Sequence, residues 1–211
     1  GEVDNPDGVL YGRLPGFGLT ELGHAMAARA AEYLVDSGAD IARVISSPLL
    51  RAQLTAAPTA AAYDLSIQSD PRLIESDNVF EGLPVNTNRA MLANPKYYKY
   101  YCNPLRPSWG EPYRDIASRM SAALSSALRE ARGREALVVS HQNPIVTLTR
   151  FVNGQPLAHA PKSRHCALAS ITSFIFSGAT LVGTSYAEPA ADLVAMAKDM
   201  TPGDSQADLR R

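Results

Sequence analysis

Three side chains in this sequence could together bind and protonate a phosphate ester. Arg51 follows the β-rich run of "VISSPLLR", His141 follows that of "VVSHQNP", and Glu75 lies in the polar loop "RLIESDNVFEG". A guanidinium offers a planar fork to two anionic oxygens, an imidazole can donate to another, and a carboxyl group can supply a proton. Each residue alone would be an ordinary surface or structural residue, so the prediction depends on their conjunction.

The segments around Arg51 and His141 share one construction. Each β-rich run ends at a serine, Ser47 or Ser140, and a proline, Pro48 or Pro144, is expected in the first turn of the helix that follows, with Asn143 able to cap the second helix. In open α/β folds the carboxyl ends of the strands meet the helix N-termini, whose unpaired N–H groups attract anions. We therefore expect both joints at one edge of a sheet.

Hydrophobic periodicity predicts the elements that must position these residues. The first helix, at 20–37, should start at a Thr20 cap and bury one face. Further helices are expected from Pro48 onwards, at 113–132 and at 144–152, and Pro58 should kink the helix that opens at Pro48 or end its first half. The expected strands are 44–45, 65–68, "ALVVS", "ALASITSFIF" and "ATLVGTSYA". On the first helix the expected buried face is Leu22, Met26, Ala30, Tyr33 and Leu34. The alternation of strands and helices predicts an α/β layered domain with a largely parallel sheet.

Length and composition limit the possible classes. The 211 residues, 45% of them hydrophobic, fit one domain, which we place at 1–199, with an irregular excursion at 83–112 and a solvated tail at 200–211. The formal net charge is -1, from 20 basic and 21 acidic residues, so no overall field favours nucleic acid or an anionic membrane. No apolar stretch approaches the roughly 20 residues that span a bilayer. Cys102 and Cys166 lack disulfide-framework or zinc spacing, and we expect a reducing, cytoplasmic setting.

Other catalytic motifs are missing from the sequence. It has no G-x-S-x-G nucleophile elbow and no G-x-x-x-x-G-K-[ST] phosphate loop, and Gly16 and Gly18 are followed by Glu21 where a dinucleotide fingerprint needs glycine. The four histidines, at 24, 141, 159 and 165, offer no paired metal-ligand spacing. We predict no metal and no cofactor.

Five blocks of the sequence resemble the histidine phosphatase superfamily, also called phosphoglycerate mutase-like. They are "GEVDNPDGVLYGRLPGFGLTELG", "SSPLLRAQLTAAP", "RLIESDNVFEG", "WGEPYRDIASRM" and "VVSHQNPI", in the order and rough spacing of that family over residues 1 to 186. The resemblance implies a three-layer α/β/α sandwich and a nucleophilic histidine in an "RHG" triplet that ends the first strand. Gly1 matches the glycine of that triplet, so we expect the chain to continue upstream and to carry the nucleophile just before Gly1.

The resemblance also implies a role for each candidate residue. His141 would be the second imidazole of the site, Arg51 would bind phosphate oxygens, and Glu75 would be the proton donor, with Asp77 as the alternative. The implied phosphate-binding residues are Arg51, His141, Gln142, Asn5 and Arg13. Gln142 stands where the family usually has glycine, but its backbone N–H can still serve.

The expected activity is a phosphomonoesterase that forms a phosphohistidine on a small phosphorylated substrate. A bisphosphoglycerate-primed mutase is the alternative within enzymes, disfavoured because the longer, arginine-rich insert and diproline block of such mutases are missing at 83–112. That excursion, rich in tyrosine, would then be a substrate-selecting lid. A catalytically silent phosphate-ligand binder is the third possibility, because none of the four histidines matches the nucleophile by motif position.

Overall fold

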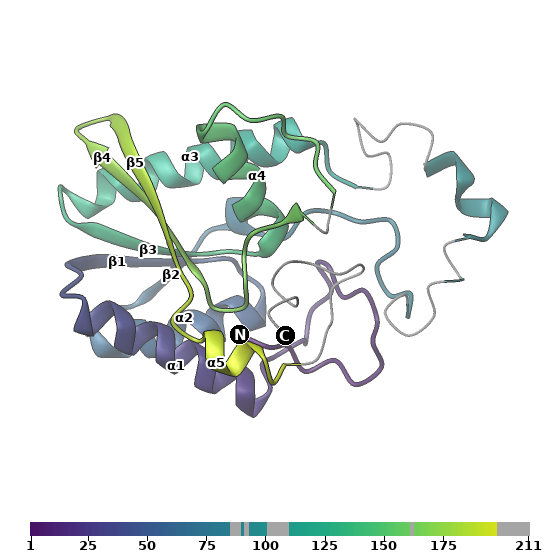
Figure 1. The fold of residues 1–211 in the computed structure, drawn as a ribbon, viewed down its shortest axis with the longest axis horizontal. Helices are drawn as coiled ribbons and strands as arrows, with labels where there is room; N and C mark the ends of the chain where they lie inside the picture. The colour runs from purple at the N-terminus through teal and green to yellow at the C-terminus, as the bar shows by residue number, and fades with distance from the viewer. Residues whose placement is uncertain (85–89, 91–92, 101–109, 161–162, 198–211) are drawn as a thin grey trace.

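The computed structural model describes residues 1–84, 90, 93–100, 110–160 and 163–197. Its centre is a three-stranded parallel sheet in the order β2-β1-β3 (Figure 1). The strands are β1 (Ile41–Ser46), β2 (Ile67–Ser69) and β3 (Glu135–Val139). Ser46 pairs with Ser69 on one side and with Val139 on the other, so the three strands end at the same level. The sequence placed these strands correctly to within a few residues.

Helices cover both faces of this sheet, as Figure 1 shows. On one face lie α1 (Glu21–Asp36) and α2 (Leu50–Ala62), and on the other lie α3 (Tyr113–Ala131) and α4 (Gln142–Val152). The Thr20 side chain accepts from the N–H of Gly23, which confirms the expected cap of α1. The layers and the mainly parallel sheet confirm the predicted α/β class.

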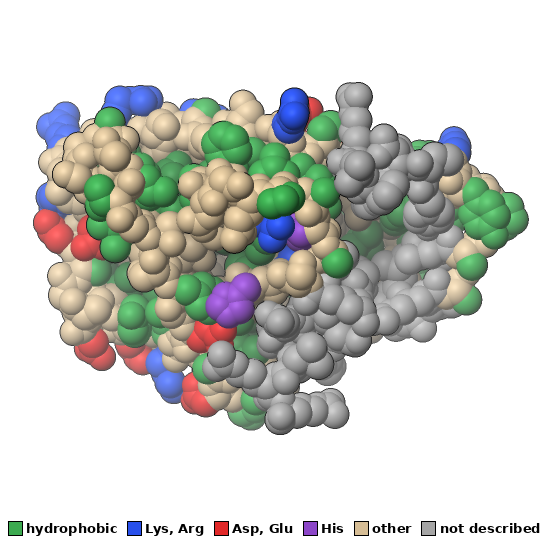
Figure 2. Space-filling model, turned by 45° about the horizontal axis from the view of Figure 1, so that its top comes forward, with side chains coloured by type: hydrophobic (Ala, Val, Ile, Leu, Met, Phe, Trp, Pro, Cys, Tyr) green, Lys and Arg blue, Asp and Glu red, His purple; other side chains and the backbone are tan. Residues whose placement is uncertain are grey.

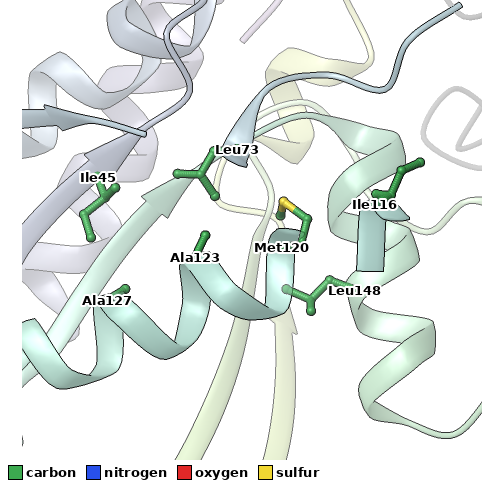
Figure 3. Packing of buried hydrophobic residues seen from close by; sticks show 7 residues of the cluster. All are labelled: Ile45, Leu73, Ile116, Met120, Ala123, Ala127 and Leu148. Atoms are coloured by element: carbon green, nitrogen blue, oxygen red, sulfur yellow. The ribbon is translucent and has the colours of Figure 1, made fainter. Parts of the chain in front are cut away.

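Two apolar clusters hold the layers together. Figure 3 shows the first, which lies between the sheet and the helices α3 and α4 and contains Ile45, Leu73, Ile116, Met120, Ala123, Ala127 and Leu148. The second lies on the opposite face and contains Ile41, Val44, Ala56 and Ala60. The many alanines allow the helices to approach the sheet closely, so the strand ends are held rigidly.

The C-terminal part of the described chain adds an antiparallel hairpin of β4 (Ile171–Ser177) and β5 (Thr180–Ala187), followed by the short α5 (Ala191–Val194). Short 3-10 helices lie at Pro71–Leu73 and Pro95–Tyr100. Of the excursion at 83–112, residues 85–89, 91–92 and 101–109 lie outside the described residues, so its role as a lid stays a prediction. The predicted tail at 200–211 also lies outside them.

Candidate active site

The first joint, between β1 and α2, buries a guanidinium. Helix α2 begins at Leu50, so Pro48 lies just before the helix and not in its first turn, as the sequence had suggested. Arg51 is 6% exposed, and its Nη2 donates to the carbonyl oxygen of Gly12 at 2.6 Å. Its guanidinium carbon lies 4.7 Å from the centre of the Tyr11 ring, a cation–π contact. These contacts hold the group in place and leave its charge without a carboxylate partner among the described residues.

The second joint, between β3 and α4, buries an imidazole. Helix α4 begins at Gln142 with His141 as its N-cap residue, so Asn143 lies inside the helix and Pro144 is its third residue. Helix N–H groups of the first turn have no partner within the helix, so proline costs no hydrogen bond there. His141 is 7% exposed, and its Nε2 lies 2.8 Å from the Ser47 hydroxyl oxygen.

The hydrogen bond between His141 and Ser47 connects the two joints, because Ser47 comes from the first and His141 from the second. The Ser47 N–H also donates to the carbonyl oxygen of Val139, at 2.9 Å. The two joints therefore lie side by side at the carboxyl edge of the sheet, as the sequence predicted.

Burial gives the two groups different charge states. The pKa of His141 lies well below 6.5 because burial disfavours the imidazolium and because Arg51 and Arg119 repel it. Burial also lowers the pKa of Arg51, and the nearby Tyr11, Glu75 and Glu81 oppose this shift. An arginine stays protonated at neutral pH, so the edge presents one fixed positive charge beside one neutral imidazole.

Glu75 lies half-buried on a loop that faces this edge. Its Oε1 accepts from the backbone N–H of Ser76 at 2.7 Å and from the Ser76 hydroxyl at 3.1 Å. The Asn143 amide donates to the same hydroxyl at 2.8 Å, which links the start of α4 to the loop. Asp77, the alternative acid, is more exposed than Glu75, and both line one cavity.

A cavity of about 1380 Å³ contains these groups. Tyr11, Arg51, Glu75, His141 and Gln142 line it, together with Gly1. The Gln142 side chain donates to the carbonyl oxygen of Cys166 at 3.1 Å. In the space-filling view of Figure 2, Lys or Arg and His side chains come to the surface near the middle of a face that is otherwise largely apolar or neutral.

Asn5 and Arg13 are not among the residues that line the cavity. The Asn5 amide donates to the carbonyl oxygen of Val9 at 2.8 Å and accepts from its N–H at 3.2 Å, so it closes its own loop. Arg13 donates to the carbonyl oxygen of Glu75 and to the Glu111 carboxylate. In these positions the two side chains support the site, and their binding of phosphate stays a prediction.

Sequence reasoning missed the residues that hold the Glu75 loop. Arg119, on α3, donates to the carbonyl oxygens of Arg72 and Ile74 at 2.6 and 2.7 Å and forms an ion pair with Glu111 at 2.8 Å. The block "WGEPYRDIASRM" contains both charged residues, but helical periodicity alone predicts Arg119 as a surface charge. Their role depends on a loop 45 to 47 residues earlier, which the spacing within the block could not reveal.

The chain belongs to the histidine phosphatase superfamily (branch 1), whose family model matches residues 1–188. It is 51% identical over 191 residues to "Uncharacterized protein Rv0525" of Mycobacterium tuberculosis, covering 90% of this chain and 94% of that protein. It is 33% identical over 160 residues to "Probable phosphoglycerate mutase GpmB" of Yersinia pestis, covering 72% of each.

Two solved structures share the fold. Bacillus stearothermophilus YhfR superposes with a TM-score of 0.72 at 24% identity, covering 86% of this chain and 90% of that one. The alpha-ribazole phosphatase from Shigella flexneri superposes with a TM-score of 0.58 at 27% identity, covering 74% of this chain and 78% of that one. The predicted phosphoglycerate mutase-like fold is therefore confirmed.

The described residues contain no helix long and apolar enough to cross a membrane. Within those same ranges, no three His, Cys, Asp or Glu side chains gather as a set of metal ligands.

Proposed function

We propose that the protein is a phosphomonoesterase that acts on a small phosphorylated substrate through a phosphohistidine. The observation that carries this proposal is that Arg51 and His141 come from two adjacent joints at one sheet edge. The hydrogen bond between His141 and Ser47 connects the joints, and both side chains line the cavity that Glu75 also lines. A phosphate group placed there would meet a planar cation and an imidazole, with a carboxyl group facing its leaving oxygen.

In the proposed first step, a histidine nitrogen attacks phosphorus while the bond from phosphorus to the leaving oxygen breaks. Arg51 and His141 stabilise the charge that grows on the nonbridging oxygens, and the Glu75 carboxyl group gives its proton to the leaving oxygen. In the second step, water attacks the phosphohistidine and Glu75 takes a proton from that water, which releases phosphate and restores the nucleophile. Two displacements thus replace one more difficult one.

The attacking histidine is proposed to lie just before Gly1. Gly1 lines the same cavity as Arg51 and His141, which supports this placement. The same cavity extends along β3, from Glu135 to Val139, and along β4, from Ile171 to Phe176. Along β3 the apolar residues from Ala136 to Val139 are only half-buried, whereas β1 is almost fully buried. A strand placed between β3 and β4 would cover them.

Hydrolysis is preferred over phosphoryl transfer between substrates. The likeness to an alpha-ribazole phosphatase supports a phosphatase, and the likeness to "Probable phosphoglycerate mutase GpmB" supports mutase activity as the second candidate. The two differ in the fate of the phosphoryl group, since a mutase keeps it on the product. We also propose that the chemistry needs no metal and takes place in the cytoplasm, which the spacing of the two cysteines supports. We propose neither nucleic acid nor a membrane as a partner, which the balanced charge supports.

The test uses the protein as encoded, including any residues before Gly1. Phosphate release from a panel of phosphomonoesters is measured at mildly acid pH with a chelator, and acid-quenched samples are analysed by mass spectrometry for a phosphohistidine. Activity that requires an added divalent metal would overturn the proposal. So would an intact mass showing that the native chain begins at Gly1, because the site would then lack its nucleophile.

The role of Glu75 is tested by its dependence on the leaving group. Glu75→Gln removes the transferable proton and nearly preserves the shape, so kcat/KM should fall by about 10²- to 10⁴-fold for alkyl phosphates, whose leaving oxygen needs a proton. Aryl phosphates with good leaving groups should lose far less. Asp77→Asn removes the alternative acid on the same loop and should cost little for either class of substrate if Glu75 is the donor. Equal losses for alkyl and aryl substrates would refute the proton-donor role.

A further inference from the structure

Arg164 contributes a further guanidinium to the cavity, which Arg51 and Arg134 also line, and the mechanism above does not use it. It lies in the loop after α4, in "SRHCALAS", is half-buried, and lines the cavity together with Glu75 and Tyr113. Glu75 is its leading electrostatic neighbour, although their side chains do not form an ion pair. Arg164 and Glu75 therefore line the same cavity and interact electrostatically within it.

Neutral partners hold Arg164 in this position. Its Nε donates to Nε2 of His159 at 3.2 Å, while Nδ1 of the same ring lies 2.7 Å from the carbonyl oxygen of Leu157. This pattern requires the proton on Nδ1 and a neutral ring, since Nε2 must accept. Tyr113 packs against the His159 ring, with 5.2 Å between ring centres, and is a further electrostatic neighbour of Arg164.

The partners of Arg164 orient the guanidinium but do not neutralise it. Within the described residues no carboxylate forms an ion pair with it, and burial lowers its pKa because the charged form is poorly solvated there. A partly desolvated charge without a counterion is costly, and an incoming anion removes that cost. A fork-shaped cation is also suited to bidentate contact with a carboxylate or a phosphate.

We propose that Arg164 binds a second anionic group of the substrate, a carboxylate or a further phosphate, carried by the leaving-group portion. This inference rests on the proposed function, because the reacting phosphate must occupy the site of Arg51 and His141. The separate positions of Arg51 and Arg164 around Glu75 then select substrates with two anionic groups over those with one.

The test uses three substrates of similar length. Two carry a second anionic group, 2-carboxyethyl phosphate and 1,3-propanediol bisphosphate, and 3-hydroxypropyl phosphate carries only the phosphate. Arg164→Gln should lower kcat/KM by about 10- to 100-fold for a doubly anionic substrate and by less than about 3-fold for the hydroxypropyl ester, the loss expected for one charge-assisted contact. The carboxylate and bisphosphate substrates show which group is preferred. Arg164→Lys should recover part of the loss, because lysine keeps the charge but not the fork.

Arg129→Gln is the matched control, since Arg129 is an exposed arginine near the end of α3. Thermal unfolding of each variant checks that the fold is kept. An equal loss on all three substrates would overturn the proposal, because Arg164 would then act through Glu75 or through the fold. Wild-type protein that shows no preference for either doubly anionic substrate would overturn it as well.

A binding measurement separates this proposal from the proposed function. Calorimetry measures the affinity for 4-phosphonobutanoate and for 4-hydroxybutylphosphonate. Neither phosphonate can be hydrolysed. Arg164→Gln should weaken only the phosphonobutanoate. One outcome is that the wild-type protein hydrolyses none of the substrates while Arg164→Gln still weakens binding of the phosphonobutanoate alone. In that case the phosphatase assignment fails and the second anion site stands. If Arg164→Gln weakens neither or both ligands equally, the second anion site is refuted whatever the activity.

Discussion

The two strand–helix joints are built alike but give the site different kinds of charge. At the β1–α2 joint, Arg51 is fixed by the Gly12 carbonyl oxygen and the Tyr11 ring, and its charge is permanent. At the β3–α4 joint, His141 is fixed by Ser47 and is neutral near pH 7. An anion bound between them would favour the imidazolium, so one joint supplies a constant charge and the other a charge that appears when ligand binds.

The helix starts explain why the joints differ. In α2, Arg51 is the second helical residue, and its long side chain leads back from the helix to the segment around Gly12. In α4, His141 is the N-cap residue with extended backbone, so its short side chain lies at the strand end itself. Similar sequence patterns thus place the guanidinium of Arg51 several bonds away from its helix and the imidazole of His141 directly at the sheet edge.

Removing the permanent charge should have the largest effect. Arg51→Ala should lower kcat/KM by at least about 10³-fold, the upper end for the loss of one transition-state donor, because the buried guanidinium also fixes the Gly12 segment. Arg51→Lys should recover only part, since an ammonium cannot contact two oxygens in one plane. Steady-state kinetics with one phosphomonoester measures both. If lysine restored full activity, the planar fork would be irrelevant and the contrast between the joints would reduce to charge alone.

Removing the switchable group should cost less, about 10²- to 10³-fold in kcat/KM for His141→Ala. The sharper measurement is the pKa of His141 by NMR with and without inorganic phosphate. Phosphate should raise that pKa, because a bound anion opposes both the burial and the repulsion from Arg51. His24→Ala, on the exposed side of α1, is the control for kinetics. A pKa that phosphate does not move would mean that the anion is not bound beside His141.

The sequence predicted most of the fold because the pattern of apolar residues follows local geometry. The strand at Glu135–Val139 and the helix at Tyr113–Ala131 were found from four or five apolar positions each. Tyr33 was wrongly placed in the core: it is 42% exposed, and Ala27 and Ala31 are buried instead. Small alanines carry too weak a hydrophobic signal to show which side of α1 meets α2 closely. Pro58 does not end α2, because neighbouring Ala60 is buried in the core.

The candidate site was predictable only in part. Arg51, His141 and Glu75 follow from motifs whose residues are close in sequence, and the structure brings them to one cavity. The contacts of Arg13, Arg119 and Arg164 depend on partners far away in the chain or on a loop without periodicity. No local pattern distinguishes such half-buried arginines from surface ones, so only the tertiary structure reveals them.

The smallest effect concerns stability and tests the neutral state of His141 directly. Its pKa is lowered on folding, so the unfolded chain binds a proton at higher pH than the native protein does. Above about pH 6.5 the histidine is neutral in both the folded and the unfolded protein, so it does not change the free energy of unfolding. Below that pH the free energy of unfolding falls, with a slope of at most about 1.4 kcal/mol per pH unit for one proton. His159, whose pKa is also lowered by burial, adds a slope of the same sign.

His141→Asn should therefore reduce the loss of unfolding free energy between pH 7.5 and 5.5, measured by urea denaturation, and leave the contribution of His159 in place. Saturating phosphate should reduce the pH dependence of the unfolding free energy of the wild-type protein. The bound anion stabilises the imidazolium of His141 and so raises its pKa in the folded protein. A slope that is unchanged by both the substitution and phosphate would show that His141 is already charged in the free protein. The two joints would then carry like charges, and the contrast between them would be lost.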